Sequence, residues 1–177
     1  MIFTPLALAG AYLIQPELRT DERGFFTRLF CVEEFAAHGL NTDIKQSNLS
    51  YNRHAGTVRG MHYQIAPHAE AKLVSCTCGA IYDVIVDLRP ESPTFKQWVG
   101  AELTADNRHA LFVPEGFAHG FQTLVDDCDV AYQMFALYHA ESARGVRWDD
   151  PAFGIVWHDG AGRYMSERDR NYPTFEG

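Results

Sequence analysis

The chain has 177 residues, of which 46% are hydrophobic and 21% are charged, and its net charge is −8 at pH 7. This length and composition fit a single domain over residues 1–177, and the acidic charge argues against a general nucleic-acid-binding surface. No apolar run is long enough to span a bilayer. The apolar start, with Pro5 and Gly10 and no basic residue before Arg19, predicts a pair of strands rather than a signal peptide. We therefore expect a cytoplasmic protein that binds neither membranes nor nucleic acids.

Short extended segments separated by turn signals follow one another along the chain, a pattern typical of an all-β sandwich or barrel. Residues 32–37 predict one short helix, which Gly39 ends. The strands expected after it cover residues 71–78, 81–88, 95–103, 109–113, 121–125 and 130–137, and residues 89–93 form a turn. The first two of these strands are joined near Gly79 and are expected to be neighbours. The C-terminal sequence is rich in turn signals, with Trp148 and Trp157 expected to pack under loops.

Alternation along two of these strands places charged side chains among apolar ones. Lys72 shares a face with Val74, and in the next strand Asp83 shares a face with Ile85. Inward-pointing charges are costly unless they are paired or functional. Either both groups lie inside and have a role, or both faces point to solvent.

The four cysteines are Cys31, Cys76, Cys78 and Cys128. Cys76 and Cys78 fall on one face of one strand, which is a poor geometry for a disulfide between them, and we expect reduced thiols. A metal site built on this C-x-C pair is an alternative. Two cysteines alone are a weak signal, and packing is the simpler interpretation.

Two histidines lie in the most informative motifs of the chain. His62 lies in the run R-G-M-H-Y-Q, and His119 ends a P-x-G-x-x-H motif that begins at Pro114. The second motif is typical of small β-barrels of the cupin type. Metal-binding cupins carry H-x-H followed by a carboxylate in the first motif, whereas Gln64 takes the place of the second histidine here. The pattern predicts acid–base chemistry without a metal ion, and a metal-dependent dioxygenase or isomerase is an alternative.

Several side chains could transfer protons at carbon. Histidine is the side chain that most readily accepts a proton near neutral pH, so His62 could act as a base, and the Lys72 ammonium can stabilise an enolate oxygen. Tyr132 can return a proton from another direction, and Asp169 can orient His62 if the C-terminal segment folds over the pocket. Each residue type alone is more often structural, but their co-occurrence with the P-x-G-x-x-H motif favours an epimerase or isomerase.

Together these residues resemble the dTDP-4-dehydrorhamnose 3,5-epimerase family, in matching order and spacing over nearly the whole chain. The segments that carry the resemblance are residues 21–26, 46–50, 59–64, 72–74, 79–89, 92–95, 114–121, 148–151 and 166–169, with Tyr132 and Tyr138. The resemblance implies a cupin-type jelly-roll barrel with short peripheral helices, and an enzyme without metal or cofactor. It also implies a homodimer that exchanges N-terminal strands, and a nucleotide-diphosphate 4-keto-6-deoxy sugar as substrate.

The resemblance also implies a role for each site residue. His62 would be the general base with Asp169 as its partner, Tyr132 the acid on the opposite side of the sugar ring, and Lys72 a group that holds the enolate oxygen. The substrate-binding residues would be Arg23, Phe26, Arg28, Gln46, Asn48, Arg59, His119, Tyr138 and Arg168. Arg23 and Phe26 would reach the pocket of the partner subunit. The implied reaction removes and returns protons at C3 and C5.

Two positions depart from the family pattern. Arg28 and Ala143 stand where the family usually has glutamates, although Glu141 is close to the second position. A carboxylate accepts a hydrogen bond from thymine or uracil, whereas an arginine only donates and suits the acceptor edge of cytosine. The alternatives are therefore a CDP-sugar as substrate, a 3-epimerase or isomerase that acts on one carbon, and, from a different class, a non-catalytic sugar-binding barrel.

Overall fold

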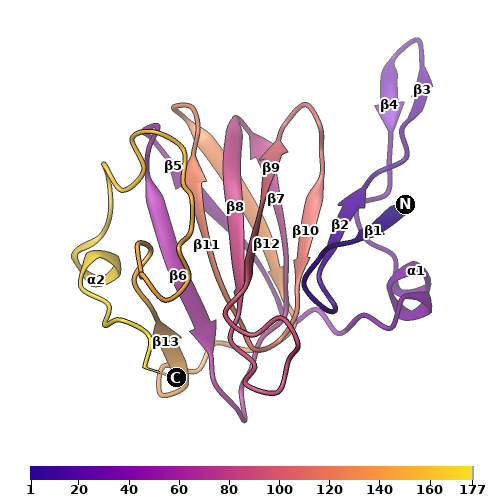
Figure 1. Cartoon of the computed structure of the whole chain (residues 1–177). Helices are drawn as coiled ribbons and strands as arrows, with labels where there is room; N and C mark the ends of the chain where they lie inside the picture. Colours follow the sequence, from indigo (N-terminus) through magenta and orange to yellow (C-terminus); the bar gives the residue numbers. More distant parts are fainter. Residues whose placement is uncertain (177) are drawn as a thin grey trace.

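Two antiparallel β-sheets pack face to face in the computed structural model, which describes residues 1–176 (Figure 1). The six-stranded sheet has the order β1-β2-β10-β7-β12-β5, with the bounds Ile2–Pro5, Tyr12–Gln15, Ala110–Val113, Lys72–Cys78, Cys128–Met134 and Gln46–Asn52. The five-stranded sheet has the order β13-β6-β11-β8-β9, with the bounds Ala143–Gly145, Val58–Gln64, Phe117–Thr123, Ala80–Asp87 and Trp98–Thr104. Together the sheets form the cupin-type jelly-roll barrel that the sequence predicted.

A hairpin of β3 (Arg19–Asp21) and β4 (Gly24–Phe26) projects away from the barrel (Figure 1). All residues of its two strands are exposed to solvent. Gly24 at its turn has a φ of 129°, which glycine adopts without a steric penalty. Phe25 of the hairpin contacts Arg108, between β9 and β10, whose guanidinium carbon lies 4.4 Å from the centroid of its ring.

The main core lies between the two sheets, because alternate side chains of each strand point inward. Its buried members include Val74, Cys76, Ile81, Ile85, Leu103, Leu111, Val113, Phe117, Phe121 and Val130. Two more apolar clusters cover the outer faces of the sheets. Phe35 belongs to the cluster on the six-stranded sheet, and the C-terminal residues Phe153 and Trp157 cover the five-stranded sheet. Trp148 lies against Trp157, with ring centroids 6.2 Å apart, a mutual contact that the predicted packing under loops did not include.

The helices are short and peripheral. α1 (Val32–Ala37) spans the predicted residues, buries Phe35, and is followed by Gly39 with a φ of 70°. α2 (Glu167–Arg170) begins after Ser166, whose hydroxyl accepts a hydrogen bond from the Asp169 amide (3.1 Å). Within residues 1–176, no helix is long and apolar enough to cross a membrane.

The strands β7 and β8 follow one another in the sequence but lie in opposite sheets, so the prediction that they are neighbours was wrong. Gly79 between them has a φ of 78°, and a Cβ at this position would lie 2.6 Å from the Cys128 thiol. Glycine therefore allows the chain to cross from one sheet to the other at a tight corner. The sequence around Gly79 does not distinguish a hairpin turn between neighbouring strands from a corner at which the chain crosses between sheets.

Several strand boundaries differ from those predicted, and five strands of the described chain, β3, β4, β5, β6 and β13, were not predicted. β9 begins at Trp98 instead of residue 95, β11 begins at Phe117 instead of residue 121, and β12 ends at Met134 instead of residue 137. β5 was not predicted because a polar side chain faces inward and an apolar one faces outward, the reverse of the usual strand pattern. Asn52 is buried, whereas Leu49 is 63% exposed. β6 also carries polar residues toward the barrel interior. Both strands border the cavity described next.

Candidate active site

Between the two sheets, beside α2, lies a cavity of about 640 Å³, an ordinary volume for a small-molecule site. Strands of both sheets and the segment around α2 contribute to its walls. The predicted site residues that line it are His62, Lys72, Tyr132, Asp169, Gln46, Asn48, Arg59, His119, Tyr138 and Arg168. The fold thus gathers residues that are far apart in the sequence into one polar pocket.

The C-terminal segment folds over this cavity and brings Asp169 of α2 to His62 of β6. Nε2 of His62 lies 2.7 Å from Oδ1 of Asp169. Burial alone would raise the pKa of Asp169, but the hydrogen bond and charge of His62, with hydrogen bonds from Gly60 and Ser166, together outweigh burial, so this pKa lies below its usual value. The carboxylate is therefore ionised at neutral pH. It holds the imidazole by one nitrogen and leaves Nδ1 for a second partner.

Tyr132 faces the cavity from the sheet opposite His62. His62 is on β6 of the five-stranded sheet, and Tyr132 is on β12 of the six-stranded sheet. A planar intermediate held between the sheets would meet a proton acceptor on one face and a proton donor on the other. That arrangement is what inversion at a carbon atom requires.

Lys72 points into the barrel, and its side chain is only 7% exposed. The alternative that its face points to solvent was wrong. Nζ lies 3.0 Å from Oε1 of Glu70 and donates a hydrogen bond to the His62 carbonyl oxygen (3.1 Å). A buried ammonium is costly to desolvate, and one carboxylate partner offsets only part of this cost. The buried Lys72 ammonium gives the cavity a positive charge that can stabilise an oxyanion.

Asp83 also points inward and is fully buried. Its Oδ1 lies 2.8 Å from Nε2 of His119, so its partner is this histidine and not Lys72. The other carboxylate oxygen, Oδ2, has no hydrogen-bond partner among residues 1–176. His119 and His62 are paired across β11 and β6. Two histidines therefore lie side by side, and each is bonded to a buried carboxylate.

Gln64, at the position of the second histidine of the metal-binding cupin motif, joins two loops. Its Nε2 donates to the carbonyl oxygens of His68 (2.9 Å) and Leu137 (3.1 Å), and its Oε1 accepts from the His139 amide (2.7 Å). These bonds fix the loop that carries Tyr138 at the rim of the cavity. In the described chain, no three His, Cys, Asp or Glu side chains are grouped so that they could hold a metal ion.

Positive charge also lines the cavity away from Lys72. Arg59 donates from Nε to Oδ1 of Asn52 (2.7 Å), which holds the guanidinium in place. Arg168 of α2, which follows His62 in the sequence whereas Arg59 precedes it, lines the same cavity. Arg59 and Arg168, together with Arg144 in the same pocket, suit a diphosphate, because guanidinium groups can donate two parallel hydrogen bonds to phosphate oxygens.

Arg23, Phe26 and Arg28 lie outside this cavity in their own chain. The Arg23 side chain is 85% exposed on the hairpin and pairs with Asp21 (2.6 Å), and Phe26 is 67% exposed. Arg28 pairs with Glu34 (2.9 Å) and borders a smaller cavity of about 240 Å³ on the outer face of the six-stranded sheet. One chain by itself does not bring these three residues to the main pocket.

The cavity also contains residues that the sequence patterns did not assign to the site: Tyr63, Glu70, Phe121, Met134, Arg144 and Ser166. Glu70 lies two residues before Lys72, so alternation in an extended chain would have placed it on the same side. Arg144 had no such signal. It follows Ala143, one of the two positions that depart from the family pattern, and both residues line the pocket.

All four cysteines are free thiols. Cys76 and Cys128 pack in the core between the sheets, and Cys78 is exposed. Burial raises the pKa of Cys76 to about 12, which makes its thiol unreactive. The packing interpretation of Cys76 is confirmed.

Comparisons with known proteins agree with this geometry. The sequence profile of the dTDP-4-dehydrorhamnose 3,5-epimerase family matches residues 5–177. The chain is 44% identical over 174 residues to the dTDP-4-dehydrorhamnose 3,5-epimerase of Sinorhizobium fredii, which covers 98% of this chain and 89% of the relative. Its structure is similar to the crystal structure of the Bacillus anthracis dTDP-4-dehydrorhamnose 3,5-epimerase with TDP and PPi bound, with a TM-score of 0.94 and 43% identity over 98% of this chain and 99% of the other. A 3'-monoepimerase from Streptomyces bikiniensis in complex with dTDP-quinovose is 33% identical, with a TM-score of 0.88 over 96% and 86% of the two chains.

Proposed function

The chain belongs to the dTDP-4-dehydrorhamnose 3,5-epimerase family, and we propose that it epimerises a dTDP-4-keto-6-deoxy sugar at C3 and C5. The observation that carries this proposal is the His62–Asp169 pair, 2.7 Å apart, in a cavity that Tyr132 enters from the opposite sheet. A non-catalytic sugar-binding barrel would not need a buried carboxylate behind the histidine or a buried ammonium beside it.

The proposed reaction uses the acidity that a 4-keto group gives to the hydrogens at C3 and C5. His62 accepts one of these protons, and the charge of Asp169 stabilises the imidazolium that forms. The electrons of the broken C–H bond move into the carbonyl group, and Lys72 stabilises the resulting enolate oxygen. Tyr132 donates a proton to the other face of the carbon, and the carbonyl group forms again. His62 then loses its proton to solvent and Tyr132 regains one, so the reaction involves no net oxidation.

The remaining cavity residues suit the rest of such a substrate. Arg59 and Arg168 would hold the diphosphate, and Gln46, Asn48 and His119 would contact the sugar. Tyr138, 60% exposed at the rim, would pack on the base.

Proton NMR in D₂O tests the proposed reaction. The wild-type protein should exchange the hydrogens at both C3 and C5 of a dTDP-4-keto-6-deoxy sugar, and a His62→Ala variant should exchange neither. Exchange at C3 alone would identify a 3-epimerase. Exchange that is unchanged in His62→Ala would refute the role of this histidine.

We propose thymidine diphosphate as the nucleotide because both the Sinorhizobium fredii and Bacillus anthracis relatives carry dTDP in their names. Arg28, the residue that suggested cytosine, is engaged by Glu34 in its own chain. A thermal-shift panel with dTDP, UDP, CDP and GDP checks this choice. Stronger stabilisation by CDP than by dTDP would support the CDP-sugar alternative instead.

We also propose that the enzyme is a homodimer in which N-terminal strands are exchanged and the β3–β4 hairpin of one chain reaches the pocket of the other. The hairpin projects from the barrel with Arg23 and Phe26 exposed (Figure 1). The outer face of β5 also carries exposed Leu49 (63%) and Tyr51 (52%), and such apolar positions are typical of an interface.

A complementation experiment tests this exchange. Arg23→Ala and His62→Ala chains are each expected to form weakly active or inactive dimers. In a mixed dimer, one pocket combines the intact His62 of one chain with the intact Arg23 of the other. Random mixing of equal amounts should therefore restore about one quarter of the wild-type activity. No restoration in mixed dimers of proven composition would contradict the exchange.

A cytoplasmic location is proposed as well, because free thiols are expected in a reducing compartment. Acid quenching of cells, followed by alkylation of the denatured protein and mass spectrometry, should find all four cysteines reduced.

A further inference from the structure

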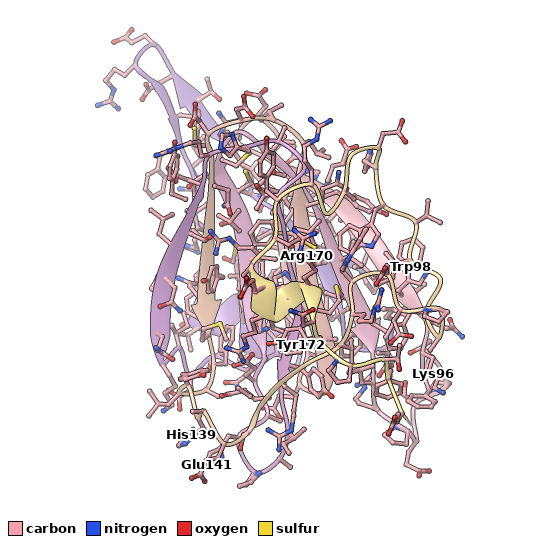
Figure 2. All side chains as sticks on the ribbon, turned by 90° about the vertical axis from the view of Figure 1, so that its left-hand side faces the viewer. Lys96, Trp98, His139, Glu141, Arg170 and Tyr172 are labelled. Carbon is pink, nitrogen blue, oxygen red and sulfur yellow. The ribbon has the colours of Figure 1, made fainter. Side chains whose placement is uncertain are left out.

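Tyr172 follows α2 and packs against the histidine that we assign as the base. Its ring centroid lies 5.8 Å from that of His62, and the two rings meet edge to face at 67°. The Arg168 guanidinium lies over the same tyrosine ring, 5.6 Å from its centroid. Figure 2 shows Tyr172 next to α2, on the side of the molecule where this helix covers the barrel. One aromatic ring thus contacts both the base and a cation of the cavity wall.

The strand behind Tyr172 makes room for its ring. Gly145 on β13 pairs with His62 on β6. A Cβ at Gly145 would lie 2.3 Å from Cζ of Tyr172 and 2.5 Å from both Cε atoms. Any side chain at this position would therefore push the ring out of its place beside His62. Glycine is needed here for space.

The hydroxyl group of Tyr172 does not explain why the side chain lies here. Its oxygen is buried and forms no hydrogen bond of ordinary geometry with residues 1–176, although the Arg168 guanidinium interacts with it and opposes the rise of its pKa on burial. A buried hydroxyl without a well-formed hydrogen bond is unfavourable. The contacts that favour this placement are those of the ring, with Gly145, His62 and Arg168.

We propose that Tyr172 is a positioning residue for His62, an inference that rests on the proposed function. Asp169 holds the imidazole only through Nε2, which lies close to the axis of the Cβ–Cγ bond, so this single hydrogen bond restrains rotation of the ring about that bond only weakly. The Tyr172 ring blocks part of that rotation and keeps Nδ1 directed at the substrate carbon. A misplacement of about 1 Å between reacting groups can lower a rate by about 100-fold.

Three variants test this role. Tyr172→Leu removes the flat ring, Tyr172→Phe removes only the hydroxyl, and Tyr164→Leu is the matched control. Tyr164 belongs to the same C-terminal segment but stacks on His54, with ring centroids 4.5 Å apart. For Tyr172→Leu we expect kcat to fall by about 10- to 100-fold with KM changed by less than about threefold. Tyr172→Phe and Tyr164→Leu should keep kcat close to that of the wild type.

Two results would overturn the proposal. One is an unchanged kcat in Tyr172→Leu, and the other is a loss in Tyr172→Phe as large as in Tyr172→Leu, which would assign the effect to the hydroxyl. If Tyr172→Leu does not fold, Gly145→Ala provides a second test, because its methyl group displaces the ring while the tyrosine remains. Thermal unfolding and dTDP binding, measured for each variant, separate lost positioning from lost structure. A wild-type protein that exchanges neither C3 nor C5 would instead refute the proposed function itself.

Discussion

An Asp169→Asn substitution would remove the negative charge beside His62 and keep the shape of the side chain. The bonded atoms are 2.7 Å apart, so the charge centres lie about 4 Å apart, where opposite charges attract by about 4 kcal/mol at an effective dielectric constant near 20. The His62 side chain is 41% exposed, and solvent screening lowers the expected value to about 2–4 kcal/mol. Because the imidazolium forms only as the proton is removed, this energy is lost from the transition state. We expect kcat to fall by about 30- to 1,000-fold.

The assay is deuterium exchange at C3 and C5 under saturating substrate, with circular dichroism to confirm that the variant is folded. Glu167→Gln is the matched control, because it removes one negative charge from an exposed position of the same helix. This control should leave kcat unchanged. A folded Asp169→Asn enzyme as fast as the wild type would refute the assignment of Asp169 as the partner of the base.

Three further substitutions test separate parts of the structure. Burial would raise the pKa of Asp87, but hydrogen bonds from Arg89 and its neighbours lower it to about 2, so Asp87→Asn should cost about 2–3 kcal/mol of stability at pH 7. Because this pKa lies below its unfolded value, the difference from wild type in urea unfolding should shrink as the pH falls from about 4 toward 2, and a constant difference would contradict the argument. Lys72→Met should lower kcat by about 100-fold or more, because the enolate loses its positive partner. The variant should also be less stable in urea unfolding, because Glu70 stays buried without its partner. An unchanged kcat would count against an enolate-stabilising role. Tyr132→Phe should still exchange deuterium into the sugar but invert it more slowly, which NMR coupling constants report, and inversion at the wild-type rate would exclude Tyr132 as the donor.

The barrel was predictable because the P-x-G-x-x-H motif encodes a local geometry. Gly116 has a φ of 80°, and the Arg89 side chain passes 2.6 Å from where its Cβ would be. The turn therefore requires glycine, and β11 starts directly after it. Alternation then points Phe117 into the core and His119 into the cavity. The motif predicts both the strand and the direction of its histidine.

Other parts of the fold had no signal in the sequence pattern. Alternation shows that a strand has two unlike faces but not which sheet it joins, so the crossing of the chain at Gly79 was not predictable. In β5 the pocket makes the inner face polar, and Leu49 on the outer face made the strand resemble a loop. Arg23 lies exposed on the hairpin, outside the pocket of its own chain, and no pattern in the sequence predicted this placement. The functional site thus disturbs the patterns that reveal a simple barrel.

The first metal-binding cupin motif is altered here in a way that suits proton transfer. A histidine bound to a metal offers its lone pair to the ion, whereas a general base must keep one lone pair for the substrate. His62 meets this demand because Asp169 occupies Nε2 and leaves Nδ1. The side-chain amide of Gln64 forms three hydrogen bonds to the backbone of the adjacent loops. The positive charge that an enolate needs is available from Lys72, whose Nζ bonds to the His62 carbonyl oxygen, and an ammonium there would also repel a cation from the same space. Base and positive charge are therefore separate groups in this pocket, and each can be removed by mutation without removing the other.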